Sequence, residues 1–190
     1  MAGGSARSLH RWFGALDTSL RGTSPSYSEW FVDRLVDTQL SQIYAAVAGD
    51  VVGSGMVEEA VGVIVAQRSL IDRQAPRLAH GDFSPSNLLV LDGRLTGIID
   101  WEGTLGAPRA NDFAWWSSVA QGPLADLTPL LKGYGVAREL NEDFPAMLLL
   151  AQLRIRLAMF VYTMQVNDTE GYRSSRQSLY QLLHRTSTTF

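Results

Sequence analysis

The sequence predicts a mainly α-helical domain that carries one small β-hairpin, an α+β fold. Two observations lead to this prediction. Apolar residues recur at helical spacing through most of the chain. In its middle, two short apolar runs flank the dipeptide Asp92-Gly93, which is a strong local signal for a β-hairpin. With 190 residues, of which 46% are hydrophobic, the chain is long enough to bury a sizeable core as one domain, or as one lobe of something larger.

Three helices are expected before the hairpin, over about 5–20, 28–48 and 56–73. Ser26 or Ser28 is placed to cap the second helix, and glycines between 49 and 55 separate it from the third. The residues expected to face inward from the second and third helices are Phe31, Leu35, Val36, Ile43, Tyr44, Val47, Val57, Ala60, Val61, Ile64 and Val65.

The two strands of the hairpin are expected at 88–91 and 95–99, and a Gly- and Pro-rich loop at 103–108. Asn111 or Asp112 is placed to cap the helix that follows. Further helices are expected at about 124–133, 141–166 and 170–184. The residues expected to form the buried stripe of the long helix are Phe144, Met147, Leu148, Ala151, Ile155, Ala158, Met159 and Tyr162.

Composition excludes several classes of function. A net charge of −3 gives no general basic surface for nucleic acid. The absence of cysteine excludes disulfides and thiolate metal sites, and it fits a cytoplasmic protein. The N-terminus lacks the apolar core of a secretory signal. The most apolar stretch, Phe144 to Tyr162, is interrupted by Gln152, Arg154 and Arg156, which predicts a core helix and no membrane span.

Four polar residues stand out in the otherwise apolar stretch from Leu78 to Glu102: His80, Asp82, Asn87 and Asp100. A histidine two residues before an aspartate, an asparagine five residues after it, and a second aspartate at the end of a strand form a layout suited to phosphoryl transfer. Asp82 and Asn87 must converge within one tight turn, and the hairpin must bring Asp100 back beside them. The plainer reading of Asp82 and Asn87 is as turn-forming residues.

The segment HGDFSPSN, followed by GIIDWE, resembles the aminoglycoside phosphotransferase family, with its choline-kinase-like and protein-kinase-like relatives. The resemblance implies the C-terminal lobe of the protein-kinase-like fold, and transfer of the γ-phosphoryl group of ATP to a hydroxyl of a small molecule with Mg²⁺. It implies that Asp82 is the catalytic base, that Asn87 binds Mg²⁺, and that Asp100 bridges Mg²⁺ to the nucleotide. It also implies supporting roles for His80 and for Asp112, which would anchor the catalytic loop.

The physical chemistry of the residues agrees with these roles. A loose phosphoryl transition state requires mainly positioning and charge neutralisation, which two metal-binding groups and one base can supply. A nearby cation also keeps the Asp82 carboxylate ionised. The alternatives are that His80 is a core histidine and that Asp112 is a plain helix cap. Asp100 is harder to explain structurally, because a carboxylate that ends an apolar strand needs a partner or a metal.

The sequence departs from the family before the catalytic loop. Family members have a smaller, strand-rich lobe that clamps the nucleotide with a lysine, but this segment is predicted to be helical and the only lysine is Lys132. The opening SARSLHRW resembles the helix after the inter-lobe hinge. One lobe is therefore expected, with a helical segment at 1–76, the catalytic loop and hairpin at 77–102, and a helical subdomain at 103–190. The glycine-rich run at 49–55 is interpreted as an interhelical turn in preference to a phosphate loop.

Several points stay open in the sequence. The smaller lobe is either lost, supplied by a partner chain, or encoded upstream, and the alternative function is a non-catalytic remnant that binds a small molecule or a protein. An uncovered lobe predicts apolar surface near residues 5–13 and on the hairpin. Arg154 is expected to extend to the surface, or to pair with a catalytic-loop carboxylate. Glu139, Glu142 and Asp143 favour the start of the long helix, with a minor substrate role open.

Overall fold

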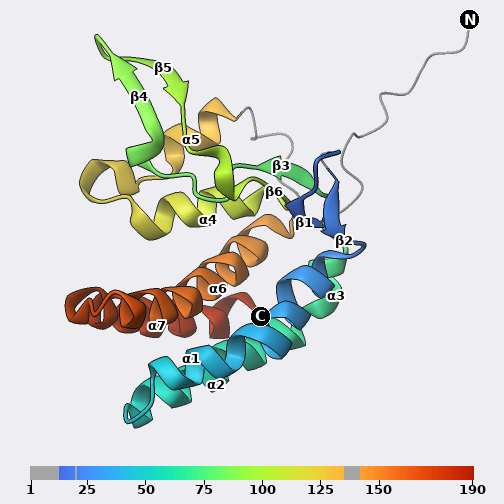
Figure 1. Ribbon diagram of the computed structural model, residues 1–190, viewed down its shortest axis with the longest axis vertical. Coiled ribbons are helices and arrows are strands. Elements are labelled where there is room, and N and C mark those ends of the chain that lie inside the picture. Colours follow the sequence, from blue (N-terminus) through green and yellow to red (C-terminus); the bar gives the residue numbers. More distant parts are fainter. Residues whose placement is uncertain (1–12, 20, 135–141) are drawn as a thin grey trace, which may run out of the picture.

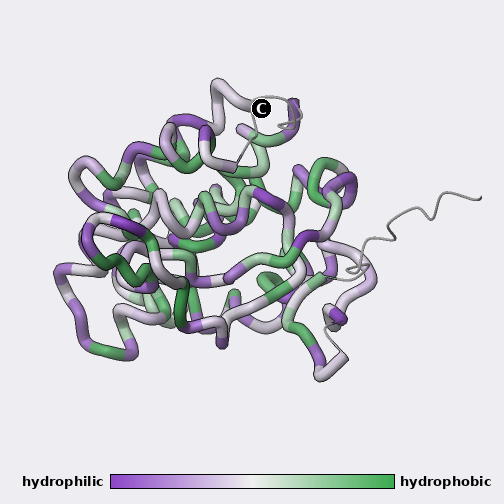
Figure 2. The backbone as a smooth tube through the Cα atoms, turned by 90° about the horizontal axis from the view of Figure 1, so that it is seen from above, coloured by the Kyte–Doolittle hydropathy of each residue, from purple (hydrophilic) through white to green (hydrophobic). Residues whose placement is uncertain are grey.

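The computed structural model describes residues 13–19, 21–134 and 142–190. Figure 1 shows two groups of elements, with the hairpin and helices α4 and α5 on one side and α1, α2, α6 and α7 on the other. Short strands join the two groups near the N-terminal end of the described chain. Hydrophobic and hydrophilic stretches alternate along the backbone (Figure 2), as amphipathic elements around a shared core require.

A four-stranded sheet in the order β2-β1-β6-β3 was not predicted. Two of its strands lie where a helix and a loop were expected. Strand β1 (Phe13–Leu16) lies where a helix over 5–20 was expected, so that prediction is wrong from 13 onward, and residues 5–12 lie outside the described chain. Strand β2 (Gly22–Ser24) follows that range and pairs with β1. Strand β6 (Leu105–Ala107) lies within the expected loop and pairs with β3 (Arg77–Ala79) and with β1. Gly14 of β1 lies opposite Gly106, a pairing across about ninety residues that local spacing cannot reveal.

The helical segment before the catalytic loop follows the sequence prediction with different boundaries. It comprises two π-helical turns and three α-helices: η1 (Glu29–Asp33), η2 (Leu35–Gln39), α1 (Leu40–Ala46), α2 (Val51–Ala66) and α3 (Arg68–Asp72). The Ser26 hydroxyl accepts a hydrogen bond from the Glu29 N–H at 3.2 Å. Most of the expected inward residues are buried, but Val36 and Val65 are exposed.

Helix α2 begins earlier than predicted, because Asp50 caps it. The Asp50 carboxylate accepts a hydrogen bond from the Gly53 N–H at 2.9 Å, and helix α2 then runs through Gly53 and Gly55. The interhelical turn is therefore confined to the residues around Gly49, which has a positive φ of 85°. The structure does not favour a phosphate loop over 49–55, because the Asp50 carboxylate already accepts from the Gly53 N–H at this helix N-terminus, where a phosphate would bind.

The second half of the chain contains the predicted hairpin and helices. Its elements are η3 (Pro85–Asn87), β4 (Leu88–Leu91), β5 (Arg94–Ile98), η4 (Trp101–Gly103), α4 (Ala110–Val119), η5 (Gly122–Ala125), α5 (Thr128–Gly133), α6 (Phe144–Gln165) and α7 (Thr169–Thr189). The hairpin turns at Asp92 and Gly93, both with positive φ, as predicted.

Helix α6 is the centre of the core. It is long and apolar enough to cross a membrane by length and composition, but 56% of its most apolar window is buried inside the domain, and it contacts α1, α2, α4 and α7. This packing is typical of a core helix. The predicted stripe is confirmed in part: Phe144, Met147, Ala151 and Ile155 are buried, whereas Tyr162 is 54% exposed. Neighbours also cover other faces of the helix, where Leu150, Leu153 and Leu157 are fully buried.

Among the acidic residues before α6, Asp143 has a structural role. Asp143 accepts hydrogen bonds from Arg73 Nη2 at 3.2 Å and from Gln74 Nε2 at 3.3 Å, which links α6 to the end of α3. Glu142 is exposed, and Glu139 lies outside the described residues.

Candidate active site

Asp82 and Asn87 meet within one short turn. Asn87 Nδ2 donates a hydrogen bond to the Asp82 backbone carbonyl at 2.8 Å and lies 3.4 Å from Asp82 Oδ2. Pro85 begins the 3₁₀ turn that positions Asn87 beside Asp82, and Asn87 is only 7% exposed. Because the amide nitrogen is bound to Asp82, the amide oxygen of Asn87 is left available to a cation.

Asp112 holds the start of this loop from helix α4. Its carboxylate accepts hydrogen bonds from the backbone N–H of His80 at 2.9 Å and of Gly81 at 3.1 Å. The expected capping role of Asn111 or Asp112 is wrong, since α4 begins at Ala110 after Arg109, and no side chain caps it. The Asp112 carboxylate is directed to the loop instead.

His80 has both ring nitrogens engaged by the backbone. The residue is 2% exposed, Nε2 lies 2.8 Å from the Ile99 carbonyl, and Nδ1 lies 3.4 Å from the Asp82 N–H. In the tautomer that suits both contacts, Nδ1 accepts from the Asp82 N–H and Nε2 donates to the Ile99 carbonyl. The ring also packs at 4.6 Å against the Trp101 ring. This arrangement ties the catalytic loop to the end of the hairpin.

The hairpin returns Asp100 to the Asn87 turn. Leu88 pairs with Ile98, and the Ile99 N–H donates to the Asn87 carbonyl at 3.0 Å. Asp100 then adopts a left-handed backbone conformation with φ of 62°, which is uncommon outside glycine and costs about 1–3 kcal/mol. Within the described part of the chain, its exposed carboxylate has no hydrogen-bond or ion-pair partner.

These residues fit a magnesium ion. Mg²⁺ is held in nucleotide sites by one or two protein oxygen ligands together with phosphates and water. The Asn87 amide oxygen and the unpartnered Asp100 carboxylate supply such ligands at adjacent backbone positions. Among residues 13–19, 21–134 and 142–190, no cluster of three or more His, Cys, Asp or Glu side chains is close enough to form an all-protein metal cage.

Gly81 is a site residue that the sequence analysis missed. It has a φ of 85°, and a Cβ added there would lie 1.9 Å from the backbone oxygen of Gly103. The backbone before Asp82 therefore packs directly on the backbone after Asp100, and only glycine fits. The HGD order of the motif was the one available signal, but nothing local indicates which glycine has such a neighbour.

Two cavities border the catalytic loop. One, of about 410 Å³, lies against His80, Phe83, Trp101 and Tyr134, and does not include the Asp82, Asn87 and Asp100 side chains. The other, of about 320 Å³, has Gly81 and Glu102 among its walls, together with parts of η1, α4 and α6.

Arg154 neither extends freely to the surface nor pairs with a catalytic-loop carboxylate, so both expectations for it are wrong. Its Nε donates to the Phe31 carbonyl at 3.0 Å and its Nη2 to Gln39 Oε1 at 3.2 Å. Its guanidinium lies 4.8 Å from the centre of the Trp30 ring. Burial lowers the pKa of Arg154 to about 10, so the group stays charged at neutral pH.

The outer part of the hairpin is an apolar surface. The exposed large side chains of the two strands are Leu89, Val90, Leu91 and Leu95, between 47% and 66% exposed. The hairpin extends away from the helices in Figure 1. The predicted apolar surface is thus confirmed on the hairpin, whereas Phe13 is buried and residues 5–12 lie outside the described chain.

Comparison with known proteins places this geometry in a family context. The family model described as the phosphotransferase enzyme family matches residues 6–150. A thermostable mutant of aminoglycoside phosphotransferase APH(4)-Ia, apo form, superposes with a TM-score of 0.73 at 17% identity, over 95% of this chain and 60% of that one. A ternary complex of such a mutant with AMP-PNP and hygromycin B gives 0.72 at 17% identity, over 94% and 59%.

APH(4)-Ia without those mutations gives a TM-score of 0.71 at 18% identity, over 94% of this chain and 59% of that one. The chain therefore spans about 60% of the length of these structures. No curated protein sequence matches it. The likeness confirms the predicted fold class, the α+β lobe of the protein-kinase-like fold.

Proposed function

The chain belongs to the phosphotransferase enzyme family, and from this premise we propose that it carries the catalytic loop of an ATP- and Mg²⁺-dependent small-molecule kinase. The proposed reaction moves the γ-phosphoryl group of ATP to a hydroxyl of the acceptor. The observation that carries this proposal is the Asp82–Asn87 turn, in which Asn87 Nδ2 donates to the Asp82 carbonyl at 2.8 Å while the hairpin delivers Asp100 alongside.

Each residue has one task in this proposal. The Asp82 carboxylate orients the acceptor hydroxyl and accepts its proton, a function worth roughly 10²–10⁴ in rate. The Asn87 amide oxygen and the Asp100 carboxylate hold Mg²⁺. The metal, when bound, neutralises charge on the transferring phosphoryl group. His80 and Asp112 keep the loop in place through the hydrogen bonds described above.

The described residues do not enclose a bound nucleotide, so another part of the protein must close over it. A neighbouring structure holds AMP-PNP and hygromycin B, and another holds ADP and hygromycin B, in proteins of which this chain spans about 60%. We propose that a further lobe, on the same polypeptide or on a partner chain, docks on the apolar hairpin surface and closes over the nucleotide. The exposed Leu89, Val90 and Leu91 supply the apolar contact.

The test combines binding with turnover. Calorimetry on the protein with the further lobe in place should detect ATP binding that requires Mg²⁺ and that disappears in Asp100→Ala. Asp82→Asn should reduce phosphoryl transfer by at least about a hundredfold while leaving ATP binding intact. Asp92→Asn is the matched control, since it neutralises an exposed aspartate of the same hairpin at a positive φ that asparagine adopts readily. Full activity in Asp82→Asn contradicts the proposed base.

A non-catalytic binding module is the second candidate function. The observation that favours it is the cavity of about 410 Å³, whose aromatic walls include Phe83, Trp101 and Tyr134 but none of the proposed catalytic side chains. This candidate predicts ligand binding that is unchanged by removal of Mg²⁺ and by Asp100→Ala. Mg²⁺-dependent ATP binding that Asp100→Ala abolishes excludes it.

A further inference from the structure

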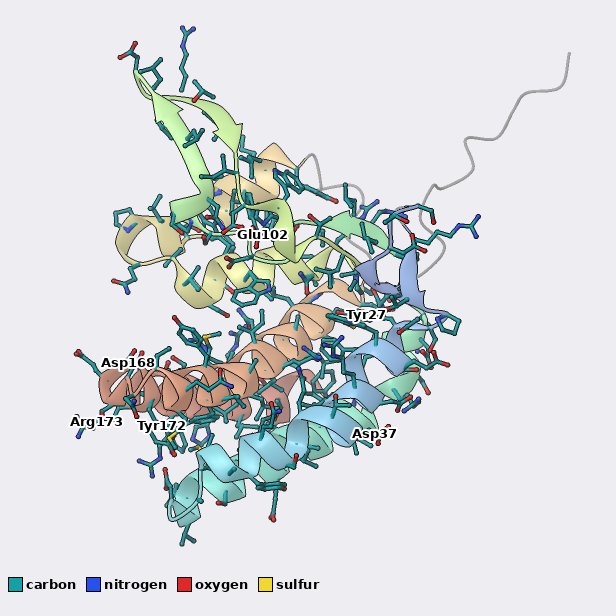
Figure 3. All side chains as sticks on the ribbon, viewed as in Figure 1. Tyr27, Asp37, Glu102, Asp168, Tyr172 and Arg173 are labelled. Carbon is teal, nitrogen blue, oxygen red and sulfur yellow. The ribbon has the colours of Figure 1, made fainter. Side chains whose placement is uncertain are left out.

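The cavity of about 320 Å³ beside the catalytic loop has the size of a small-molecule site. Its walls include Gly81, which directly precedes the proposed base Asp82, and Glu102 of η4. Trp30, Arg34 and Arg154 also line it, from η1, from the residue after η1, and from α6. Figure 3 shows Glu102 on the hairpin side of the molecule, above α6. A ligand in this cavity lies between the two groups of elements and next to the loop.

Two arginines, Arg34 and Arg154, line the cavity together with Glu102, and neither forms an ion pair with that carboxylate among the described residues. Arg154 donates only to neutral oxygens, those of Phe31 and Gln39. The Arg34 side chain has no hydrogen-bond or ion-pair partner in the described ranges. Arg34 also acts with burial to lower the pKa of Arg154, so two like charges lie close to each other. Placing like charges together at a partly buried site is unfavourable unless an anion joins them.

The Arg154 guanidinium is also held ready for a planar anion. Its Cζ lies 4.8 Å from the centre of the Trp30 ring and 5.2 Å from that of Phe31, and two of its three nitrogens are bound. The remaining Nη1 has hydrogens to donate, and Arg34 has all of its own. Guanidinium groups fixed in this way bind carboxylate and phosphate oxygens with little loss of side-chain freedom.

We propose that this cavity is the acceptor site and that it selects a small hydroxyl compound carrying an oxyanion group, which Arg34 and Arg154 bind. The proposal rests on the proposed function for the fate of the hydroxyl, which then faces the wall formed by Gly81, the residue before Asp82. The same two charges repel polycationic acceptors. The oxyanion is a carboxylate or a phosphate, two sources of the same chemistry.

Four ligands that share a three-carbon hydroxyl skeleton and differ in charge separate the outcomes: glycerate, glycerol 3-phosphate, glycerol and 3-amino-1,2-propanediol. Titration of the chain without nucleotide, followed by NMR or calorimetry, should show saturable binding of glycerate or glycerol 3-phosphate and none of the neutral or cationic analogue at the same concentration. Whichever anion binds more tightly identifies the carboxylate or the phosphate as the preferred group. Equal binding of all four, or binding of none, overturns the proposal.

Arg34→Gln should weaken anion binding about tenfold, the loss expected for one charged hydrogen bond. Arg34 is exposed, so this variant should fold, which circular dichroism checks; Arg154→Gln is the more severe second variant. Arg173→Gln is the control, because it removes an exposed charge of α7 far from Glu102 (Figure 3). An Arg34→Gln variant that binds like the unaltered chain contradicts the site.

These measurements use no nucleotide, so they are independent of phosphoryl transfer. If anion binding persists while the protein with its further lobe in place shows no Mg²⁺-dependent ATP binding, the proposed kinase function is refuted and the anion site stands. If the protein transfers the phosphoryl group to uncharged acceptors but does not bind the anions, the anion site is refuted and the proposed kinase function stands.

Discussion

The Asp112 carboxylate accepts hydrogen bonds from two successive backbone N–H groups, those of His80 and Gly81, at 2.9 and 3.1 Å. Helix α4 thereby fixes the backbone one residue before the proposed base. The position of Asp82 depends on a residue thirty positions further along the chain.

Asp112→Ala should lower the free energy of unfolding by about 2–4 kcal/mol, because two backbone donors lose a charged acceptor. Asp112→Asn, which keeps one acceptor oxygen, should lose less. Urea denaturation measures both. Asp126→Asn is the control: this exposed carboxylate accepts from the Thr128 N–H at 2.9 Å, and its loss should cost under about 1 kcal/mol. Equal losses at the two sites contradict the anchoring contact.

Gly81→Ala and Gly49→Ala form a matched pair, since both glycines have a φ of 85°. An added methyl group at Gly49 meets nothing within 4 Å, so that variant should lose only the backbone preference, about 1–2 kcal/mol. At Gly81 the methyl group lies 1.9 Å from the Gly103 oxygen, so the loss should exceed that of Gly49→Ala by at least about 1 kcal/mol. Thermal unfolding checks the ranking, and similar values for the two variants contradict the close approach.

Stability at acid pH should depend on Asp50. The Gly53 N–H holds the pKa of this carboxyl below its usual range, Tyr172 and Arg176 act in the same direction, and burial opposes them. A folded-state pKa below the unfolded value of about 4 adds stability above that pH, and this stability is lost as the pH falls toward the folded pKa.

Asp50→Asn should therefore flatten the fall in unfolding free energy as the pH drops below about 4, as measured by urea denaturation at several pH values. Asp37→Asn, which removes an exposed carboxylate without a hydrogen-bond partner among the described residues, is the control. An unchanged slope in Asp50→Asn contradicts the prediction.

The double variant Val90→Thr, Leu91→Gln should reduce both self-association of the chain and its binding of a hydrophobic dye. Both effects are expected because these apolar side chains are 63% and 66% exposed on the hairpin. The free energy of unfolding should change by less than about 0.5 kcal/mol, since little buried contact is lost. Sedimentation velocity measures the association. Leu124→Gln changes a 52% exposed leucine elsewhere and should leave association as it was. Association that is unaffected by the hairpin changes argues against this surface as a docking face.

Local sequence was sufficient for the hairpin and for most helices, because their signals lie within a few residues. Asp92-Gly93 predicts the turn, and apolar spacing predicts α1, α2 and α7. Strands β1, β3 and β6 were missed because each has only three or four residues, and each exists through pairing with a distant strand. The early start of α2 had a readable signal, since Asp50 is a favourable N-cap residue.

In the candidate site, too, local features could be predicted from the sequence and long-range contacts could not. The motif spacing was enough to bring Asp82, Asn87 and Asp100 into one hairpin, because a single turn and two strands connect them. The surroundings of Arg154 were not predictable, because its partners Phe31 and Gln39 lie more than one hundred positions away. The direct contact of Gly81 with Gly103 likewise depends on how two loops pack.

The pairing of β3 with β6 has a consequence for how the domain opens. Ala79 lies opposite Leu105, so the segment between them leaves the sheet and returns to it at adjacent positions. The ends of this segment meet at one pair of strands, so separating β3 from β6, together with loss of the Asp112 hydrogen bonds, releases the loop, the hairpin and the proposed metal ligands together. Amide hydrogen exchange along 77–79 and 105–107 would therefore follow one cooperative opening event. A segment whose ends meet is also the natural unit to transplant, because the remaining scaffold needs to supply only two neighbouring strand ends and one carboxylate on α4.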